Sequence, residues 1–183
     1  ADDGFILSLG VDFADHSYNK KDYNSKHNIR LTGATSGSFL ITYSGKFHHV
    51  LGDLDLLFDG HFANPINYTF FYGLGNETTN DQDRNYYRTR YDSKGVFTGL
   101  GYDFMRQSSL TLNIGYENNE PAIDTSGTIF ETDDFFGTDK VNLFEASINF
   151  DLDFRNHSTF PTSGTRFFAS YKNGLITNND NSN

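Results

Sequence analysis

The stretch Leu54-Asp55-Leu56-Leu57-Phe58-Asp59-Gly60-His61-Phe62 carries the pattern that decides the fold. Every second position from Leu54 onward holds an apolar residue or glycine, and the positions between them include Asp55, Asp59 and His61. Successive side chains of a β-strand point to opposite faces, so one face of this strand is apolar and the other is charged. Carboxylates and an imidazole are costly in a dry core but cost little beside a water-filled barrel lumen. The stretch therefore predicts a transmembrane β-strand.

The same period of two recurs on both sides of this stretch. The predicted lipid-facing residues are Leu54, Leu56, Phe58, Leu110, Leu112, Ile114, Phe150, Leu152 and Phe154. The predicted lumen-facing residues are Asp55, Asp59, Asn113, Asp151 and Asp153. Upstream of Val96 the alternation is charged on the face that later becomes apolar, which indicates either a segment beyond the bilayer or a bulge near Gly95. The further strands are predicted at residues 4–14, 27–48, 96–104, 110–116, 144–155 and 165–172.

The lengths of the connections predict which end of the barrel each one occupies. Residues 27–48 fit one long strand, or a hairpin broken at Ser36-Gly37. With one strand there, long and short connections alternate, as in outer-membrane barrels with long outer loops and short periplasmic turns. This predicts residues 15–26, 65–85 and 120–139 outside, and residues 49–52, 106–109 and 156–163 inside. A soluble β-sandwich also alternates apolar and polar residues and stays open as the alternative.

Composition is consistent with a barrel. The 183 residues have a mean hydropathy of -0.56, yet 16% are aromatic, which is too many for a disordered chain. No run of about 18 apolar residues is present, so a membrane-spanning helix is excluded. The net charge of -10 argues against a nucleic-acid partner. The chain opens Ala1-Asp2-Asp3 without the features of a signal peptide, so we expect that a signal was removed or that the sequence starts inside a larger protein.

Two motifs go beyond the alternation. The first is Phe70-Phe71-Tyr72-Gly73-Leu74-Gly75-Asn76-Glu77-Thr78. The second is Asp151-Leu152-Asp153-Phe154-Arg155-Asn156 followed by Phe160-Pro161-Thr162-Ser163-Gly164-Thr165. Asp151, Asp153 and Arg155 share one parity, so they are expected to be close enough to pair. Pro161 fixes φ and suits a turn, Gly164 permits a positive φ, and Phe160 is placed to anchor at a lipid–water boundary.

Together the two motifs resemble the bacterial surface-antigen family of outer-membrane barrels, the superfamily of BamA and TamA. The matching positions are Gly73, Gly75, Asn76, Asp153, Arg155, Phe160, Pro161 and Gly164. The resemblance covers residues from about 64 to 174, and the remainder of the chain fits by patterning only. It implies an antiparallel transmembrane β-barrel in a Gram-negative outer membrane. Residues 1–183 are expected to form one barrel domain that supplies about seven or eight strands, an incomplete barrel, and to contain no POTRA or hydrolase domain.

The resemblance also implies function. It favours insertion or translocation of polypeptides at the outer membrane, with the lipid bilayer, lipopolysaccharide, client outer-membrane proteins and assembly-complex subunits as partners. The alternative is a barrel that anchors a fused phosphoesterase or patatin-like hydrolase, which the wording of the first motif also resembles. In either case the barrel itself is expected not to be an enzyme.

The residues predict no catalytic group, cofactor or metal site. Gly73-Leu74-Gly75 lacks the lysine of a phosphate-binding loop. His48-His49 and His61 lack metal-ligand spacing and are interpreted as structural. The acidic residues from Glu131 to Asp134 lack the glycine and the ligand order of a calcium loop.

Overall fold

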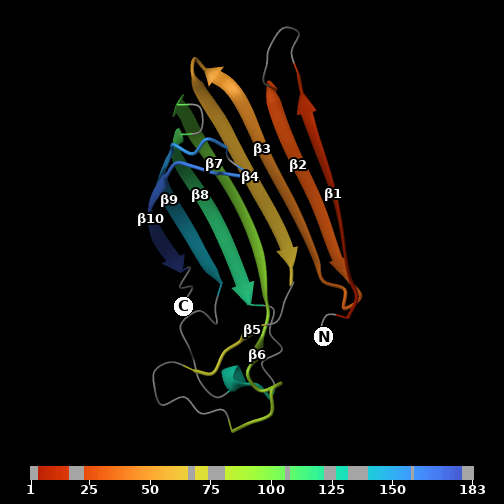
Figure 1. Cartoon of the computed structure of the whole chain (residues 1–183). Helices are drawn as coiled ribbons and strands as arrows, with labels where there is room; N and C mark the ends of the chain where they lie inside the picture. Colours follow the sequence, from red (N-terminus) through yellow and green to blue (C-terminus); the bar gives the residue numbers. More distant parts are fainter. Residues whose placement is uncertain are drawn as a thin grey trace.

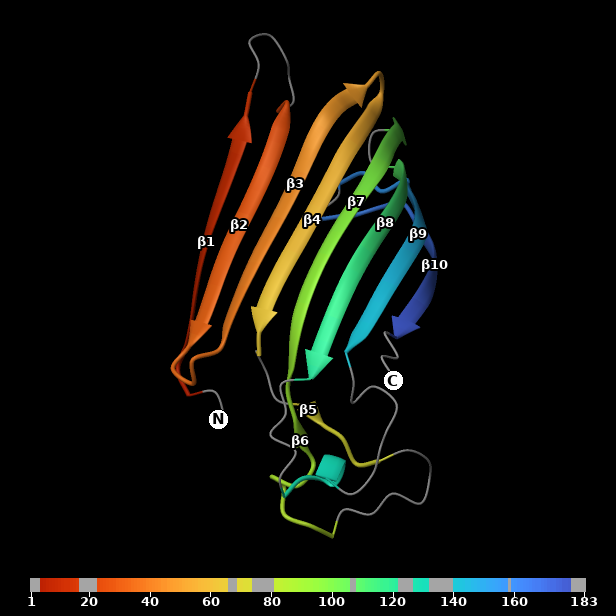
Figure 2. The same cartoon turned by 180° about the vertical axis from the view of Figure 1, so that it is seen from behind.

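The computed structural model describes residues 4–16, 23–65, 69–73, 81–105, 108–121, 127–131, 140–157 and 159–178. Within these residues the protein is all-β, with one eight-stranded antiparallel sheet in the order β1-β2-β3-β4-β7-β8-β9-β10 and a separate pair, β5–β6 (Figures 1 and 2). The described part of the chain holds no helix long and apolar enough to span a membrane.

The elements follow one another along the chain as neighbours in the sheet. The large strands are β1 (Ile6–Asp15), β2 (Ser25–Ala34), β3 (Phe39–Leu51), β4 (Leu54–Asn64), β7 (Tyr91–Met105), β8 (Ser108–Pro121), β9 (Val141–Asp153) and β10 (Arg166–Asn178). The small elements are β5 (Thr69–Phe70), β6 (Arg88–Thr89) and the short 3-10 helix η1 (Ile129–Glu131).

The prediction of one strand over residues 27–48 is wrong, and the hairpin alternative is confirmed. Gly33 pairs with Phe39, and the backbone N–H of Ala34 donates to the Ser38 carbonyl at 2.8 Å. Gly37 closes the turn with a φ of 89°, a backbone conformation that glycine adopts without a Cβ clash. The chain therefore reverses once more than the single-strand interpretation assumed.

Because of this additional reversal, one connection lies at the opposite end of the sheet from the end predicted for it. The connections 16–24, 52–53, 106–107 and 154–165 share one end of the sheet, which we call the turn end. The connections 35–38, 65–90 and 122–140 share the other, which we call the loop end. Placing residues 15–26 with the two long loops was therefore wrong, whereas 65–85 and 120–139 do lie at the same end.

Of the two alternatives for the charged stretch upstream of Val96, the bulge near Gly95 is wrong. The pairing of β7 with β4 and with β8 runs through Gly95 without a shift. Irregular pairing occurs instead between Phe47 and Leu51 and between Asp103 and Met105, both at the turn end.

The strand register confirms that the predicted apolar and polar residues of the strands divide between two opposite surfaces of the sheet. Leu56 pairs with Leu100, and Leu112 pairs with both Leu100 and Ile148, which places these residues on one surface, the apolar face. Asp55 pairs with Gly101 on the opposite surface, the polar face. Asp59, Asn113, Asp151 and Asp153 share the polar face by the same ladders.

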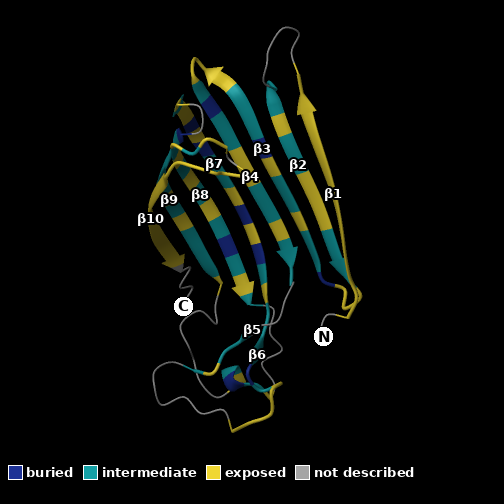
Figure 3. Cartoon of the chain, viewed as in Figure 1, coloured by how far each residue is buried: buried dark blue, intermediate teal, exposed yellow. Residues whose placement is uncertain are grey.

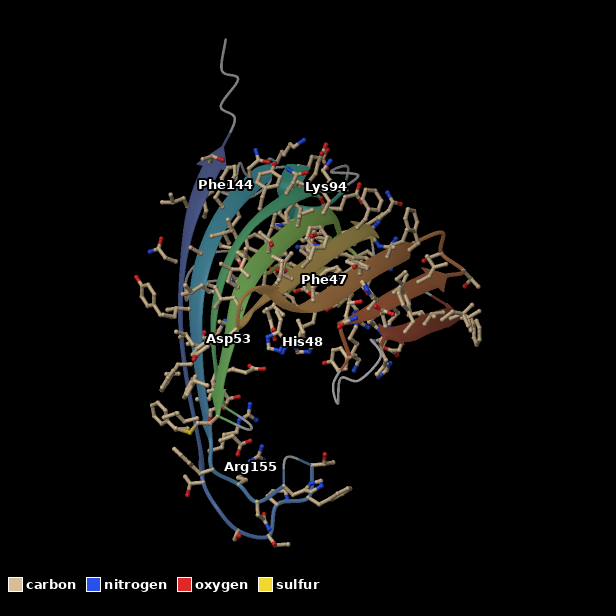
Figure 4. The ribbon with its side chains drawn as sticks, turned by 90° about the horizontal axis from the view of Figure 1, so that it is seen from above. Phe47, His48, Asp53, Lys94, Phe144 and Arg155 are labelled. Carbon is tan, nitrogen blue, oxygen red and sulfur yellow. The ribbon has the colours of Figure 1, made fainter. Side chains whose placement is uncertain are left out.

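The eight-stranded sheet is curved and is not closed. β1 and β10 occupy its two edges and are not paired with one another in the described residues. All ten residues of β1 are exposed (Figure 3). Figure 4 shows the curvature, with His48 on the concave side. Because His48 contacts Asp55, the polar face is the concave one.

Candidate functional site: an exposed apolar face and a cross-linked polar face

The convex surface of the sheet is a continuous layer of exposed hydrophobic side chains. Most of the strongly exposed large hydrophobic residues of the strands belong to it: Leu7, Leu9, Val11, Phe13, Ile29, Leu31, Ile41, Phe58, Phe62, Val96, Leu100, Tyr102, Leu112, Ile114, Tyr116, Phe144, Ile148, Phe167, Tyr171 and Leu175. Contiguous apolar patches of this kind are rare on soluble monomers and mark a surface that contacts a partner or a membrane.

Aromatic rings are concentrated near both ends of the apolar face. At the turn end Phe13 stacks on His27 with ring centroids 4.5 Å apart, and Phe104 stacks on Phe150 at 6.0 Å. At the loop end Phe39 stacks on Phe62 at 5.7 Å, and Tyr116 lies 4.9 Å from Phe144. Between these rows lie mainly aliphatic residues, namely Leu9, Val11, Ile29, Ile41, Leu100, Leu112, Ile114 and Ile148.

The polar face is cross-linked by charged and polar pairs between neighbouring strands. Arg166 of β10 donates from Nε to Asp151 of β9 at 2.8 Å, and from Nη2 to the second carboxylate oxygen. Lys172 lies 2.6 Å from Glu145. Asn113 of β8 donates to Ser147 of β9 at 3.3 Å. Because the pairs join adjacent strands, they also fix the register on this face.

A denser cluster surrounds Asp55 near the turn end. The side chain of Asp55 is only 4% exposed, and one of its carboxylate oxygens lies 2.8 Å from His48 Nδ1 and 3.0 Å from Lys46 Nζ. The backbone N–H of His49 donates to its other oxygen at 3.1 Å. Lys46 also lies 3.4 Å from Asp103 of β7. A buried carboxylate with this number of donors is well compensated for the water that it has lost.

Asp153 and Arg155, predicted on parity to pair, are in contact at the end of β9. Arg155 donates to the Asp153 carboxylate from Nε at 2.8 Å and from Nη2 at 2.6 Å. These hydrogen bonds raise the pKa of the Arg155 guanidinium above its ordinary value. The backbone N–H of Asp153 donates to Ser108 Oγ at 2.9 Å, which ties the end of β9 to the start of β8.

The segment containing Phe160, Pro161 and Gly164 connects β9 to β10, which are adjacent and antiparallel as predicted. Asn156 Oδ1 accepts from the backbone N–H groups of Thr162 and Ser163 at 3.1 and 3.3 Å. Gly164 has a φ of 104°, and a Cβ there would contact the Phe154 carbonyl oxygen.

The remaining motif residues are only partly described. Phe160 is 79% exposed, consistent with a ring available to a boundary. Gly73 has a φ of 98°. Gly75 and Asn76 lie outside the described residues.

Sequence reasoning missed a small folded unit at the loop end. The sequence predicts separate loops at residues 65–85 and 120–139. The backbone N–H of Ile129 nevertheless donates to the carbonyl of Tyr86, just after the first loop, at 3.0 Å. Phe71 stacks on Phe130 at 5.5 Å, and Tyr87 is only 2% exposed. We call this group, formed by β5, β6 and η1, the loop-end unit. The aromatic composition of 69–72 and 86–87 is the signal that could have indicated it.

Searches of protein-family models, curated proteins and solved structures found no match to this chain. Within the described residues, no group of three or more His, Cys, Asp or Glu side chains is arranged to hold a metal ion. Glu131, from the acidic stretch considered above, accepts from the Gly127 N–H at 2.7 Å, while residues 132–134 lie outside the described residues.

Proposed function

We propose that the chain forms part of the wall of a transmembrane β-barrel in a Gram-negative outer membrane. The apolar face contacts lipid, and the polar face lines a hydrated lumen. The observation that carries this proposal is the concentration of exposed hydrophobic side chains on one face of all eight strands. In water this surface would be strongly unfavourable, whereas hydrocarbon solvates it.

Strand length and aromatic placement support the same proposal. The eight large strands contain 10 to 15 residues, and a tilted transmembrane strand needs about 9–11. Aromatic rows near both strand ends suit the two lipid–water boundaries of a bilayer. A soluble sandwich would require a second sheet to cover the apolar face, and the described residues supply only the small β5–β6 pair besides the main sheet.

Within such a membrane, the favoured role is insertion or translocation of polypeptides. Support comes from the resemblance of the two motifs to the surface-antigen family and from the polar, concave face. The edges of β1 and β10 add to it, because the backbone groups of an edge strand can pair with another strand.

The membrane proposal is tested by paired cysteine substitutions, since the chain has no natural cysteine. The substitutions are Ile114→Cys and Asn113→Cys, because residues 113 and 114 are neighbours in β8 whose side chains lie on opposite faces. A fluorophore at position 114 should be quenched by lipid-soluble quenchers, and one at position 113 by water-soluble quenchers. Equal quenching of both by the water-soluble reagent would contradict the proposal.

The role is tested by depleting the full-length protein in its native host. Insertion or translocation predicts lower levels of other outer-membrane or secreted proteins. Normal levels of those proteins, together with loss of a hydrolase from the cell surface, would instead favour the anchoring role.

A further inference from the structure

The two adjacent histidines at the turn end of β3 have an unusual backbone arrangement. Among the described residues, His49 is the single non-glycine residue with a positive φ, at 56°. That conformation is unfavourable for an L-residue, because it brings Cβ close to the following carbonyl oxygen. It is stabilised by the backbone hydrogen bond from His49 to Asp55. The consequence is that the side chains of two successive residues lie close together, with ring centroids 6.1 Å apart, instead of on opposite faces.

The polar contacts of the two Nδ1 atoms indicate the tautomer of each ring. His48 Nδ1 lies 2.8 Å from the Asp55 carboxylate, and His49 Nδ1 lies 3.3 Å from the Gly52 carbonyl oxygen. Both partners accept hydrogen bonds only, so both Nδ1 atoms carry the proton. In a neutral ring the Nε2 atom then presents a bare lone pair.

Other histidines of the chain do not present an Nε2 lone pair in this way. His27 contacts Tyr43 through Nδ1 and Ser25 through Nε2, so both of its nitrogens are engaged. His157 accepts backbone N–H groups at Nδ1 and therefore carries its proton on Nε2. His61 contacts Ser93 through Nε2. In the described residues neither His48 nor His49 makes a hydrogen bond through Nε2.

We propose that His48 and His49 bind a late first-row divalent transition-metal ion, such as Cu²⁺, through their Nε2 atoms. An Nδ1–H that donates to a carboxylate or a backbone carbonyl is the outer-shell arrangement of metal-ligating histidines. Asp55 and the Gly52 carbonyl supply it here, so Asp55 orients a ligand and is not one itself. Two imidazoles leave the other coordination positions to water, and imidazole suits copper, nickel and zinc.

The site lies on the concave, polar side of the sheet, where His48 is seen in Figure 4. Lys46 neutralises Asp55 from the other side at 3.0 Å, so the carboxylate holds the imidazole without adding a free negative charge. Selectivity for a soft or borderline ion over Ca²⁺ or Mg²⁺ follows, because those ions require oxygen ligands. This proposal rests on the β3–β4 hairpin alone and is independent of the role proposed for the barrel in the membrane.

The test is a Cu²⁺ titration of the full chain, folded in detergent without a histidine tag, in a buffer that does not bind copper. We expect one equivalent of Cu²⁺ and an electron paramagnetic resonance spectrum with coupling to two imidazole nitrogens. His49→Ala, at an exposed position, should remove the second coupling and lower the affinity at least tenfold. His61→Ala is the matched control and should leave both unchanged.

Asp55→Asn tests the positioning role, since it should lower the affinity about 10–100-fold while both nitrogens remain in the spectrum. Should Asp55→Asn fail to fold, His49→Ala still decides the question. No stoichiometric binding, or the same spectrum and affinity in wild type and His49→Ala, would overturn the proposal.

Discussion

A positive charge in the middle of the apolar face should severely destabilise the protein in a bilayer. Ile114 is the residue of choice because it is 64% exposed and lies at the centre of β8, between Leu112 and Tyr116. Its neighbours across the sheet are Thr98 of β7 and Ala146 of β9, neither of which can neutralise an arginine. We therefore predict that Ile114→Arg exposes the guanidinium to hydrocarbon.

The magnitude follows from the depth of the position. An arginine at the midplane of a β-barrel costs about 2–4 kcal/mol, which is about a 30- to 700-fold change in the folding equilibrium. The matched control is Thr111→Arg on the polar face of the same strand. Thr111 lies opposite Gly101, which has no side chain to clash with the new arginine. In the lumen the charge stays hydrated, so the control should cost well under 1 kcal/mol.

The assay is urea-induced unfolding of the two variants in lipid vesicles, followed by tyrosine fluorescence and by the electrophoretic shift between folded and unfolded forms. The membrane assignment predicts that the midpoint falls far more for Ile114→Arg than for Thr111→Arg. If the two variants lost the same stability, or if Thr111→Arg lost more, the assignment of the faces to lipid and lumen would be wrong.

Three further predictions concern backbone and packing. Gly164→Val forces a β-branched residue into a positive φ against the Phe154 carbonyl, so it should cost on the order of 1 kcal/mol or more and lower the assembled amount measured in membranes; normal assembly would contradict it. A Cβ at Gly115 would lie 2.5 Å from Phe97 Cε1, so Gly115→Ala should cost about 1–3 kcal/mol in urea unfolding, and Phe97→Leu in the same chain should restore part of that loss. Tyr87→Ala should open the loop-end unit to protease while the electrophoretic shift of the sheet stays unchanged, because Tyr87 belongs to that unit and not to the sheet ladders.

The faces of the sheet could be predicted from sequence because the period of two reports side-chain direction directly. The hairpin at 35–38 could not be separated from a long strand by the same signal. Its turn contains an even number of residues, so Leu31 and Phe39 keep the same parity across the reversal. The alternation therefore runs through the turn without a break, and only Gly37 marks it.

Contacts between polar side chains could be predicted from the sequence only where the two residues are close in the chain. Asp153 and Arg155 are two residues apart, and their shared parity was sufficient to expect the pair. The Asp55 cluster depends on an irregular backbone at His49 and on Asp103 from another strand, which periodicity does not encode. The contact between Tyr86 and Ile129 joins two loops that are distant in sequence and share no pattern.

That contact also sets an order of events for folding. Tyr86 and Ile129 flank the β7–β8 hairpin, one before its first strand and one after its second. Before β7 pairs with β8, bringing Tyr86 and Ile129 together carries the full entropic cost of closing a long loop. After the two strands have paired, Tyr86 and Ile129 are already close, and most of that cost has been met. The loop-end unit should therefore form after the hairpin, so a fluorescent probe at Tyr87 would report a step that follows the pairing of β7 with β8.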